Sequence, residues 1–231
     1  MALRTMAYTT GWWGTLQAST GPRALRHTRR GTLALISARP PARSGSGGAV
    51  AAAPRVLVLG GAGTFGRRLA RHLLVAAGGS DDAPMEVVLA GRTAGTLAQC
   101  AAELWEEARC SPHARPVWVT TDVRDPAVFA DTLDAVRPTV VVHTAGPFQA
   151  LGGDGDRYIV ARACVRHGCH YVDMCDDRSF VEGFADSLDA AATEAGVTLI
   201  TGASTTPGLT SAVVQRFREA WPAGELHNVQ M

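Results

Sequence analysis

The strongest constraint on the fold is a regular alternation of short apolar runs and longer amphipathic segments, which begins at residue 55. Apolar runs rich in Val and Leu and bounded by Gly, Pro or polar residues are typical of strands buried in a parallel sheet. The predicted strands are residues 55–60, 85–90, 116–121, 139–144, 169–173 and 197–201. The predicted helices are residues 64–77, 96–108, 126–136, 157–167, 180–195 and 209–221. This order predicts an α/β fold with a doubly wound parallel sheet.

Two of the predicted helices carry more detailed signals. Asp125 followed by Pro126 has the pattern of a helix N-cap with proline in the first helical position. The first helix has apolar residues at helical spacing, which we expect to pack on the sheet. The residues on that face are Phe65, Leu69, Leu73 and Ala76.

The glycine-rich loop after the first strand is the first candidate for a binding site. It reads Gly-Gly-Ala-Gly-Thr-Phe-Gly from Gly60, which satisfies the pattern G-x-G-x-x-G. Between a strand and a helix this pattern is typical of dinucleotide sites. Gly61 would take a tight turn, Gly63 would let backbone N–H groups approach a pyrophosphate, and Gly66 would let helix and strand pack closely. The alternative is a plain glycine-rich connection. The loop residues predicted to hold the cofactor are Gly61, Gly63, Thr64, Phe65 and Gly66.

The residues after the second and third strands indicate which nucleotide the site prefers. NAD sites usually carry Asp or Glu after the second strand to bind the ribose 2′-hydroxyl. This chain has Arg92 and Thr93 there, and their guanidinium and hydroxyl suit a 2′-phosphate, so the predicted cofactor is NADP. The alternative for Arg92 is a solvated loop arginine. Asp122 and Val123 follow the third strand, where adenine usually rests, and Asp122 either accepts from the adenine amino group or begins a turn.

Three further loops follow the fourth, fifth and sixth strands. The loop after the fourth strand lies at the edge of the sheet where the nicotinamide half would lie, and its small residues permit close approach. The loops over residues 173–177 and 202–208 open on the same edge, so we expect them to wall the nicotinamide pocket. The predicted cofactor contacts after the fourth strand are Thr144, Ala145, Gly146 and Pro147.

Taken together, these segments resemble the saccharopine dehydrogenase NADP-binding domain family over about residues 55–217. The matching segments are residues 56–70, 89–92, 143–149, 168–173 and 202–211. Within them, the sequences Ala-Gly-Pro-Phe and Tyr-Val-Asp, in this order, are more specific than the glycine loop. The resemblance implies a Rossmann-type domain and an NAD(P)-dependent oxidoreductase, and members of the family act on secondary amines of amino-acid type.

Two features depart from the family pattern. Family members usually continue into an α+β substrate domain, and residues 152–156 lengthen a loop close to the expected nicotinamide. We therefore expect residues 54–221 to form the NADP-binding domain and residues 222–231 to be a tail that starts a missing substrate domain.

Charged residues are distributed unevenly along the chain. All 22 basic residues are Arg; residues 1–80 hold 11 of them and no acid, whereas residues 81–231 hold 11 Arg and 21 acids. The absence of Lys excludes Schiff-base chemistry, a P-loop lysine and a Tyr-x-x-x-Lys dyad. The acidic body argues against nucleic acid as the main partner, and the apolar runs are too short to cross a membrane.

Residues 1–53 have the composition of a targeting segment. They contain seven Arg, eleven Ser or Thr and no acid, and they end in a loose Gly/Ser/Ala run. This composition is typical of a transit peptide, so we expect an organellar protein of the mitochondrion or chloroplast. The alternative is a disordered extension, in which case a cytoplasmic location is expected.

Three groups of reactive residues are not expected to carry chemistry. Tyr158 and Arg162 imitate Tyr-x-x-x-Lys, but Arg does not exchange protons as Lys does. Asp173, Asp176 and Asp177 are expected to be solvated in a loop, with orientation of the substrate or action as a base as the alternative. A third group spans a helix end, a turn and a strand, which favours structural residues over a metal site. Its members are Cys164, His167, Cys169, His170 and Cys175.

The sequence favours an NADP-dependent oxidoreductase, or its cofactor-binding half, acting on a small-molecule substrate through a C–N or similar bond. The alternative is a non-catalytic NADP-binding sensor or interaction module. No catalytic residue is identified, and a homodimer is left open.

Overall fold

The computed structural model describes residues 53–78, 85–108, 116–148 and 156–220. Their strands form one parallel sheet in the order β3-β2-β1-β4-β5-β6. The strands are β1 (Arg55–Leu59), β2 (Glu86–Gly91), β3 (Val117–Thr120), β4 (Val140–His143), β5 (His170–Asp173) and β6 (Leu199–Ile200). The order reverses between β1 and β4, as in doubly wound sheets that bind dinucleotides. The predicted fold class is confirmed.

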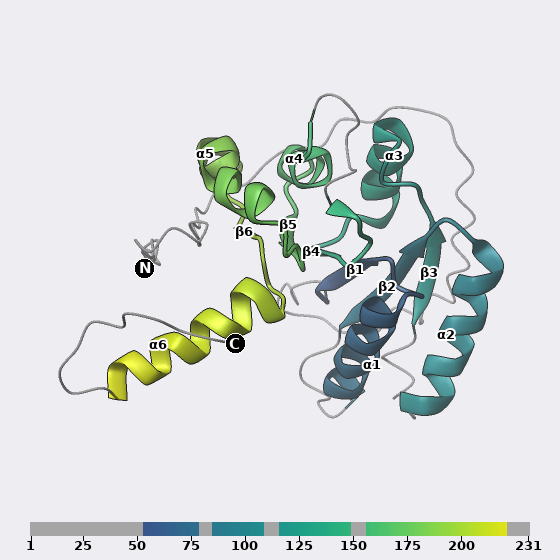
Figure 1. Ribbon diagram of the computed structural model, residues 1–231. Coiled ribbons are helices and arrows are strands. Elements are labelled where there is room, and N and C mark those ends of the chain that lie inside the picture. Colours follow the sequence, from purple (N-terminus) through teal and green to yellow (C-terminus); the bar gives the residue numbers. More distant parts are fainter. Residues whose placement is uncertain (1–52, 79–84, 109–115, 149–155, 221–231) are drawn as a thin grey trace, which may run out of the picture.

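The helices lie in two layers, one on each face of the sheet (Figure 1). Alternation along β1 divides the core: Val56 and Val58 pack with α1 and α2, whereas Leu57 and Leu59 pack with α3, α4 and α5. The helices are α1 (Thr64–Gly78), α2 (Ala94–Ala108), α3 (Pro126–Val136), α4 (Ile159–Arg166), α5 (Arg178–Ala195) and α6 (Thr210–Ala220). Strand β6 is shorter than predicted, and a kinked turn, η2 (Thr205–Leu209), in which Thr206 has extended backbone angles, precedes α6.

The prediction for the buried face of α1 was wrong in part. Phe65 is 60% exposed and Ala76 is also exposed, whereas Ala70, Leu74 and Ala77 are buried. The reason lies at Gly66, where a Cβ atom would stand only 2.3 Å from the Gly60 carbonyl oxygen. Because of this close contact, Gly66 faces the sheet. The buried residues Ala70, Leu74 and Ala77 lie on the same face of the helix, since they follow Gly66 at helical spacing.

The predicted N-cap of α3 is confirmed. The Asp125 side chain accepts hydrogen bonds from the backbone N–H groups of Ala127 and Val128, so it caps α3 with Pro126 in the first helical position. Asp177, expected in a solvated loop, caps α5 by accepting from the N–H of Phe180.

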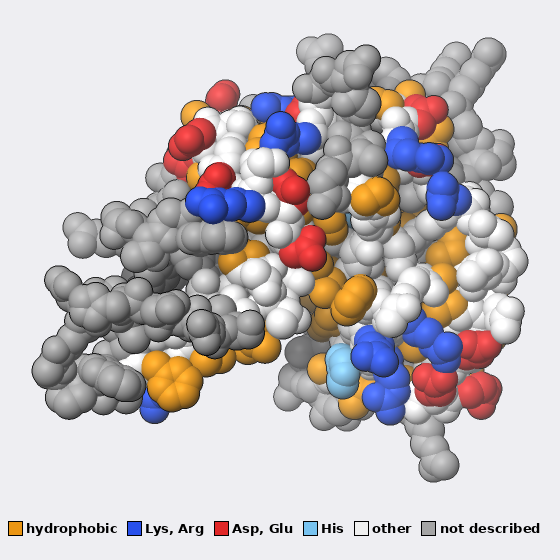
Figure 2. All heavy atoms as spheres, viewed as in Figure 1, with side chains coloured by type: hydrophobic (Ala, Val, Ile, Leu, Met, Phe, Trp, Pro, Cys, Tyr) orange, Lys and Arg blue, Asp and Glu red, His pale blue; other side chains and the backbone are white. Residues whose placement is uncertain are grey.

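Helix α6 extends away from the two helical layers (Figure 1), and apolar side chains lie on its surface (Figure 2). Its exposed apolar residues include Val213 and Phe217, which follow exposed Leu209 at intervals of four. No helix among the described residues is long and apolar enough to cross a membrane. The N-terminal segment up to residue 52, most of the lengthened loop at 152–156 and the tail at 222–231 lie outside the described residues.

Candidate functional site

A cavity of about 520 Å³ opens at the carboxyl ends of β1, β2, β3 and β4. It therefore lies where the strand order reverses, which is the usual ligand position in doubly wound sheets. The lining residues are Leu59, Gly60, Ala62, Gly63, Ala90, Gly91, Arg92, Thr93, Thr96, Leu97, Thr121, Asp122, Val123, Arg124, Ala145, Gly146 and Pro147.

The structure brings most of the predicted site residues to this cavity. Those in its lining are Gly63, Arg92, Thr93, Asp122, Val123, Ala145, Gly146 and Pro147. The predicted residues outside the lining are Gly61, Thr64, Phe65, Gly66 and Thr144. Gly66 and Thr144 support the loop from below: the Thr144 hydroxyl donates to the Leu59 carbonyl at 2.7 Å, and a Cβ on Gly66 would meet that hydroxyl at 2.8 Å.

The glycine loop is folded back onto the end of β2. Gly60 has a φ of +74°, and the N–H groups of Gly60 and Gly61 both donate to the Ala90 carbonyl. The turn glycine is therefore Gly60, whereas Gly61 was predicted. A Cβ on Gly61 would stand 2.9 Å from Leu89, so that position needs glycine for close packing. The loop ends at the first turn of α1, where unpaired N–H groups form a ready site for a phosphate.

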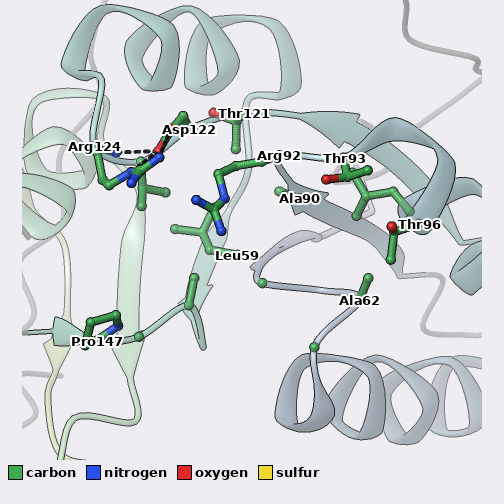
Figure 3. A pocket seen from close by; sticks show the side chains of 17 residues that line it. Leu59, Ala62, Ala90, Arg92, Thr93, Thr96, Thr121, Asp122, Arg124 and Pro147 are labelled. Carbon is green, nitrogen blue, oxygen red and sulfur yellow. Dashed lines mark hydrogen bonds and ion pairs between the residues drawn. The ribbon is translucent and has the colours of Figure 1, made fainter.

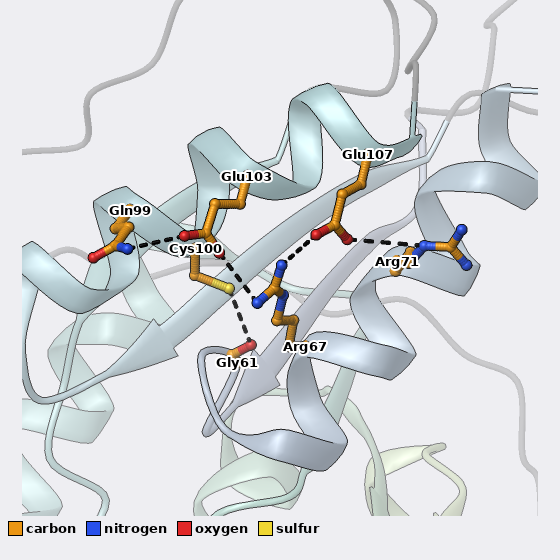
Figure 4. A network of polar contacts seen from close by, with 7 residues as sticks. All are labelled: Gly61, Arg67, Arg71, Gln99, Cys100, Glu103 and Glu107. Carbon is orange, nitrogen blue, oxygen red and sulfur yellow. Dashed lines mark hydrogen bonds and ion pairs between the residues drawn. The ribbon is translucent and has the colours of Figure 1, made fainter.

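A polar network holds α1 and α2 together beside this loop (Figure 4). Arg67 of α1 pairs with Glu103 and Glu107 of α2, and Arg71 also approaches Glu107. Cys100 of α2 lies buried beneath them, with its Sγ 3.9 Å from the Gly61 carbonyl oxygen. These contacts therefore fix the start of α1 relative to α2, and they join α2 to the glycine loop.

Arg92 and Thr93 lie between the end of β2 and the start of α2. Figure 3 shows the Arg92 side chain extending into the cavity, with the Thr93 and Thr96 side chains on the other side of the loop. Thr96 was missed in the sequence, although it belongs to the first turn of α2 next to a predicted site. This end of the cavity combines a guanidinium, two hydroxyls and a helix N-terminus, all of which suit an anion.

Asp122 and Arg124, after β3, form a tight pair at the same end of the cavity (Figure 3). The Arg124 Nε donates to Asp122 Oδ1 at 3.0 Å, its Nη2 donates to Oδ2 at 2.7 Å, and its backbone N–H donates to Oδ1 at 3.1 Å. The side-chain hydrogen bond from Arg124 is the main cause that lowers the pKa of Asp122 to about 2. Asp122 begins a turn and also lines the cavity. Its position is therefore compatible with both predicted roles, a turn residue and an acceptor for the adenine amino group.

The other end of the cavity is formed by the small residues after β4. Ala145, Gly146 and Pro147 line it, and the Gly146–Pro147 peptide bond is cis. Phe148 follows them and is buried edge-on against the His143 ring, with ring centroids 4.8 Å apart. Because these residues are small, a flat ring such as a nicotinamide has room to lie against their backbone.

Strands β4 and β5 carry a cluster of buried polar side chains next to these residues. His143 and Asp173 are neighbours in the strand register and both are fully buried, so the expectation of a solvated Asp173 was wrong. Asp173 Oδ1 accepts from the Cys175 N–H, the Thr201 hydroxyl and the Gly202 N–H. The carboxylate is buried because it fastens the loops after β5 and β6 to each other.

Burial shifts the pKa values of these side chains so that their neutral forms are favoured. It lowers the pKa of His143 to about 4 and raises the pKa of Asp173. The His143 Nδ1 lies 3.1 Å from the Tyr171 hydroxyl oxygen. His143 Nε2 and Asp173 Oδ2 make no hydrogen bond of ordinary geometry within the described part of the chain.

The other reactive residues have structural surroundings in the described part of the chain. The Tyr158 hydroxyl is buried and donates to the Phe180 carbonyl, and Arg162 pairs with Asp156. No three potential metal ligands gather among the residues that the structure describes. The described cysteines are buried free thiols, and burial raises the pKa of each one: Cys100, Cys164, Cys169 and Cys175.

Comparison with known proteins identifies one family. The sequence of the saccharopine dehydrogenase NADP binding domain matches residues 56–200, which is more than half of the chain. No curated protein matches.

Solved structures with a similar fold include reductases and dehydrogenases of low sequence identity. A reductase/Diels-Alderase from Malbranchea aurantiaca is 14% identical, with a TM-score of 0.50 over 64% of this chain and 71% of that one. A short-chain type dehydrogenase/reductase from Mycobacterium ulcerans is 23% identical, with a TM-score of 0.44 over 62% of this chain. The chain spans 64% of the length of that protein. At such identities the likeness concerns the fold alone.

Proposed function

The chain belongs to the saccharopine dehydrogenase NADP-binding domain family, and from that premise we propose that it selects NADP and presents it for hydride transfer. Family and fold make it the NAD(P)-binding part of an oxidoreductase. The choice of NADP over NAD and the substrate class are our proposal. The proposed substrate is a small molecule that reacts at a C–N or similar bond.

The observation that carries the choice of cofactor is the position of Arg92. Its side chain enters the cavity directly after β2, where a ribose 2′-substituent lies in this fold (Figure 3). No carboxylate occupies that position, because the residues after β2 are Arg92 and Thr93. A guanidinium binds a phosphate through paired, charge-assisted hydrogen bonds, whereas a ribose diol calls for a carboxylate.

The rest of the cavity fits the remainder of a dinucleotide. The backbone around Gly63 and the first turn of α1 would bind the pyrophosphate, and Ala145, Gly146 and Pro147 would lie beside the nicotinamide. When bound, the nicotinamide supplies the hydride chemistry, and this chain supplies binding and orientation.

Calorimetric titration with NADPH and NADH tests this proposal. A charge-assisted hydrogen bond contributes about 1.5–3 kcal/mol, or roughly 10- to 150-fold in affinity. We expect NADPH to bind at least about tenfold more tightly than NADH, and Arg92→Ala to remove most of that difference while leaving NADH affinity nearly unchanged. Arg166→Ala, at an exposed position on α4, is the matched control. Equal affinities of the wild type for NADPH and NADH would indicate that Arg92 is a solvated loop residue.

A second function, an NADP-binding module without chemistry of its own, is favoured by the burial of His143, Tyr171 and Asp173. These titratable groups on β4 and β5 face the core and not the cavity. Assays of NADP-dependent oxidation with saccharopine and related secondary amines separate the two functions. Turnover would favour the oxidoreductase, whereas NADP binding without turnover of any amine would favour the module for this chain.

A further inference from the structure

Three charged side chains from neighbouring loops share the adenosine end of the cavity. Strands β2 and β3 pair with Gly91 opposite Thr120, so the residues that follow each strand lie side by side. Arg92 comes from the first loop, and Asp122 and Arg124 come from the second (Figure 3). The three carry a net charge of +1, and a 2′-phosphate bound there would meet all of them.

Asp122 is the unfavourable member of this group. Its carboxylate lines the cavity that we propose for a phosphate, and like charges in one site repel each other. Arg92 is also close enough to contribute to the lowering of the Asp122 pKa. The carboxylate could therefore harm phosphate binding in two ways, by repelling the phosphate and by drawing the Arg92 guanidinium toward itself.

Arg124 counters both effects in the structure. Its guanidinium contacts both oxygens of Asp122, and its backbone N–H donates to Oδ1, so three hydrogen bonds engage the carboxylate. Figure 3 shows Arg124 folded back onto Asp122, whereas Arg92 extends into the cavity. No hydrogen bond or ion pair joins Arg92 to Asp122 among the described residues.

We propose that Arg124 is a positioning residue for cofactor selection, which neutralises Asp122 and thereby keeps Arg92 available for the 2′-phosphate. This inference rests on the proposed preference for NADP. It makes selection a property of three residues, in which Arg92 binds the phosphate and Arg124 acts through Asp122.

The test is a double-mutant cycle read as the ratio of the NADH and NADPH dissociation constants, measured by calorimetry. Arg124→Ala should reduce the preference for NADPH about tenfold, which corresponds to about 1.4 kcal/mol, because the released carboxylate competes for Arg92. Asp122→Asn should keep the preference, since any contact of this side chain with adenine is common to both nucleotides. The double variant Asp122→Asn/Arg124→Ala should recover the wild-type ratio to within about threefold, because the charge that needed Arg124 is gone.

The possible results separate this inference from the proposed function. A wild type that does not prefer NADPH would overturn both. A wild-type preference that Arg124→Ala leaves intact would overturn this inference alone. The same holds if the double variant stays as unselective as Arg124→Ala, because Arg124 would then contact the phosphate itself. Both side chains are partly exposed, at 32% for Asp122 and 59% for Arg124, so the variants should fold, and thermal unfolding checks this.

Discussion

The two sides of the sheet's carboxyl edge use polar side chains in opposite ways. On the side of β2 and β3, Arg92, Asp122 and Arg124 are at least partly exposed and line the cavity. On the side of β4 and β5, His143 and Asp173 are fully buried. The first side leaves its charged groups accessible from the cavity, whereas the polar groups of the second side make internal hydrogen bonds.

We infer from this contrast that the two sides have different tasks. Exposed charges at strand ends can exchange water for a ligand and so determine specificity. A buried carboxylate that accepts three hydrogen bonds instead fixes the backbone, and Asp173 does this for the loop after β6 that leads to η2 and α6. We therefore expect changes on the β4 and β5 side to alter stability, and changes on the β2 and β3 side to alter cofactor choice.

The largest loss of stability is expected from Asp173→Ala. It leaves three buried donors without their acceptor, which should lower the free energy of unfolding by about 3 kcal/mol or more in denaturant titrations. Asp173→Asn should cost less, because the amide oxygen still accepts. Asp176→Ala, at an exposed position in the same loop, is the control and should stay within about 0.5 kcal/mol of wild type. A large change in the NADPH preference of Asp173→Asn would break the contrast between the two sides.

Acid should destabilise the protein through His143. Its pKa is lowered to about 4 in the folded protein, so between pH 6.5 and 4 the unfolded chain binds a proton that the folded protein does not. Stability should fall as the pH falls through this window, by about 3 kcal/mol in total. The raised pKa of Asp173 acts in the opposite direction, because its stabilising contribution increases toward acid.

The difference in unfolding free energy between wild type and His143→Gln, measured at each pH, isolates the histidine. The contribution of Asp173 is present in both proteins and cancels. A difference that stays constant from pH 6.5 to 4 would show that His143 takes up its proton in the folded state at the ordinary pKa.

Gly66→Ala should affect both sides equally, because Gly66 packs against Gly60 of the glycine loop, which follows the central strand β1. The new Cβ would meet the Gly60 carbonyl oxygen at 2.3 Å and the Thr144 hydroxyl at 2.8 Å. We expect a loss of about 1–3 kcal/mol in stability and weaker binding of NADPH and NADH with their ratio unchanged. In Gly95→Ala, a helical site where a Cβ would meet nothing within 4 Å, stability should rise by up to about 1 kcal/mol. Unchanged affinity and stability in Gly66→Ala would mean that the loop moves freely.

Asp125→Ala tests whether cofactor choice depends on the helix that follows the Asp122–Arg124 pair. Loss of this N-cap should cost about 1 kcal/mol in thermal or denaturant unfolding. Asp131→Ala, exposed on the same helix, is the control. The ratio of NADPH to NADH affinity should change by less than about twofold. A larger change would show that α3 positions the pair, and the contrast would then need to include the helix.

Hydrophobic periodicity in the sequence predicts the strands and helices well, because buried strands need continuous apolar runs. It predicts side-chain environment less well. The burial of Asp173 depends on the loop after β6, whose Thr201 and Gly202 lie 28 and 29 residues further along the chain and contact its carboxylate. Exposure of Phe65 follows from the contact between Gly66 and Gly60, which selects one face of α1. Periodicity alone contains neither piece of information.

The candidate site shows the same limit. Arg92 and Asp122 could be predicted because their places after β2 and β3 are fixed by the order of elements. Arg124 was missed because its spacing from Asp122 in the sequence does not by itself predict a contact. Only the three hydrogen bonds in the structure reveal the pair. The tight turn was assigned to Gly61 because Gly61 is the first glycine of the G-x-G-x-x-G pattern, and only the φ angle shows that Gly60 takes the turn.

The most direct test of cofactor choice uses nucleotide fragments that reach the β2 and β3 side but not the β4 and β5 side. Adenosine 2′,5′-bisphosphate and adenosine 5′-monophosphate differ only in the 2′-phosphate, and neither contains nicotinamide. If Arg92 and its neighbours determine cofactor choice by themselves, calorimetry should show the bisphosphate binding at least about tenfold more tightly than the monophosphate. Equal affinities for the two fragments would contradict the central claim that this side of the sheet selects NADP.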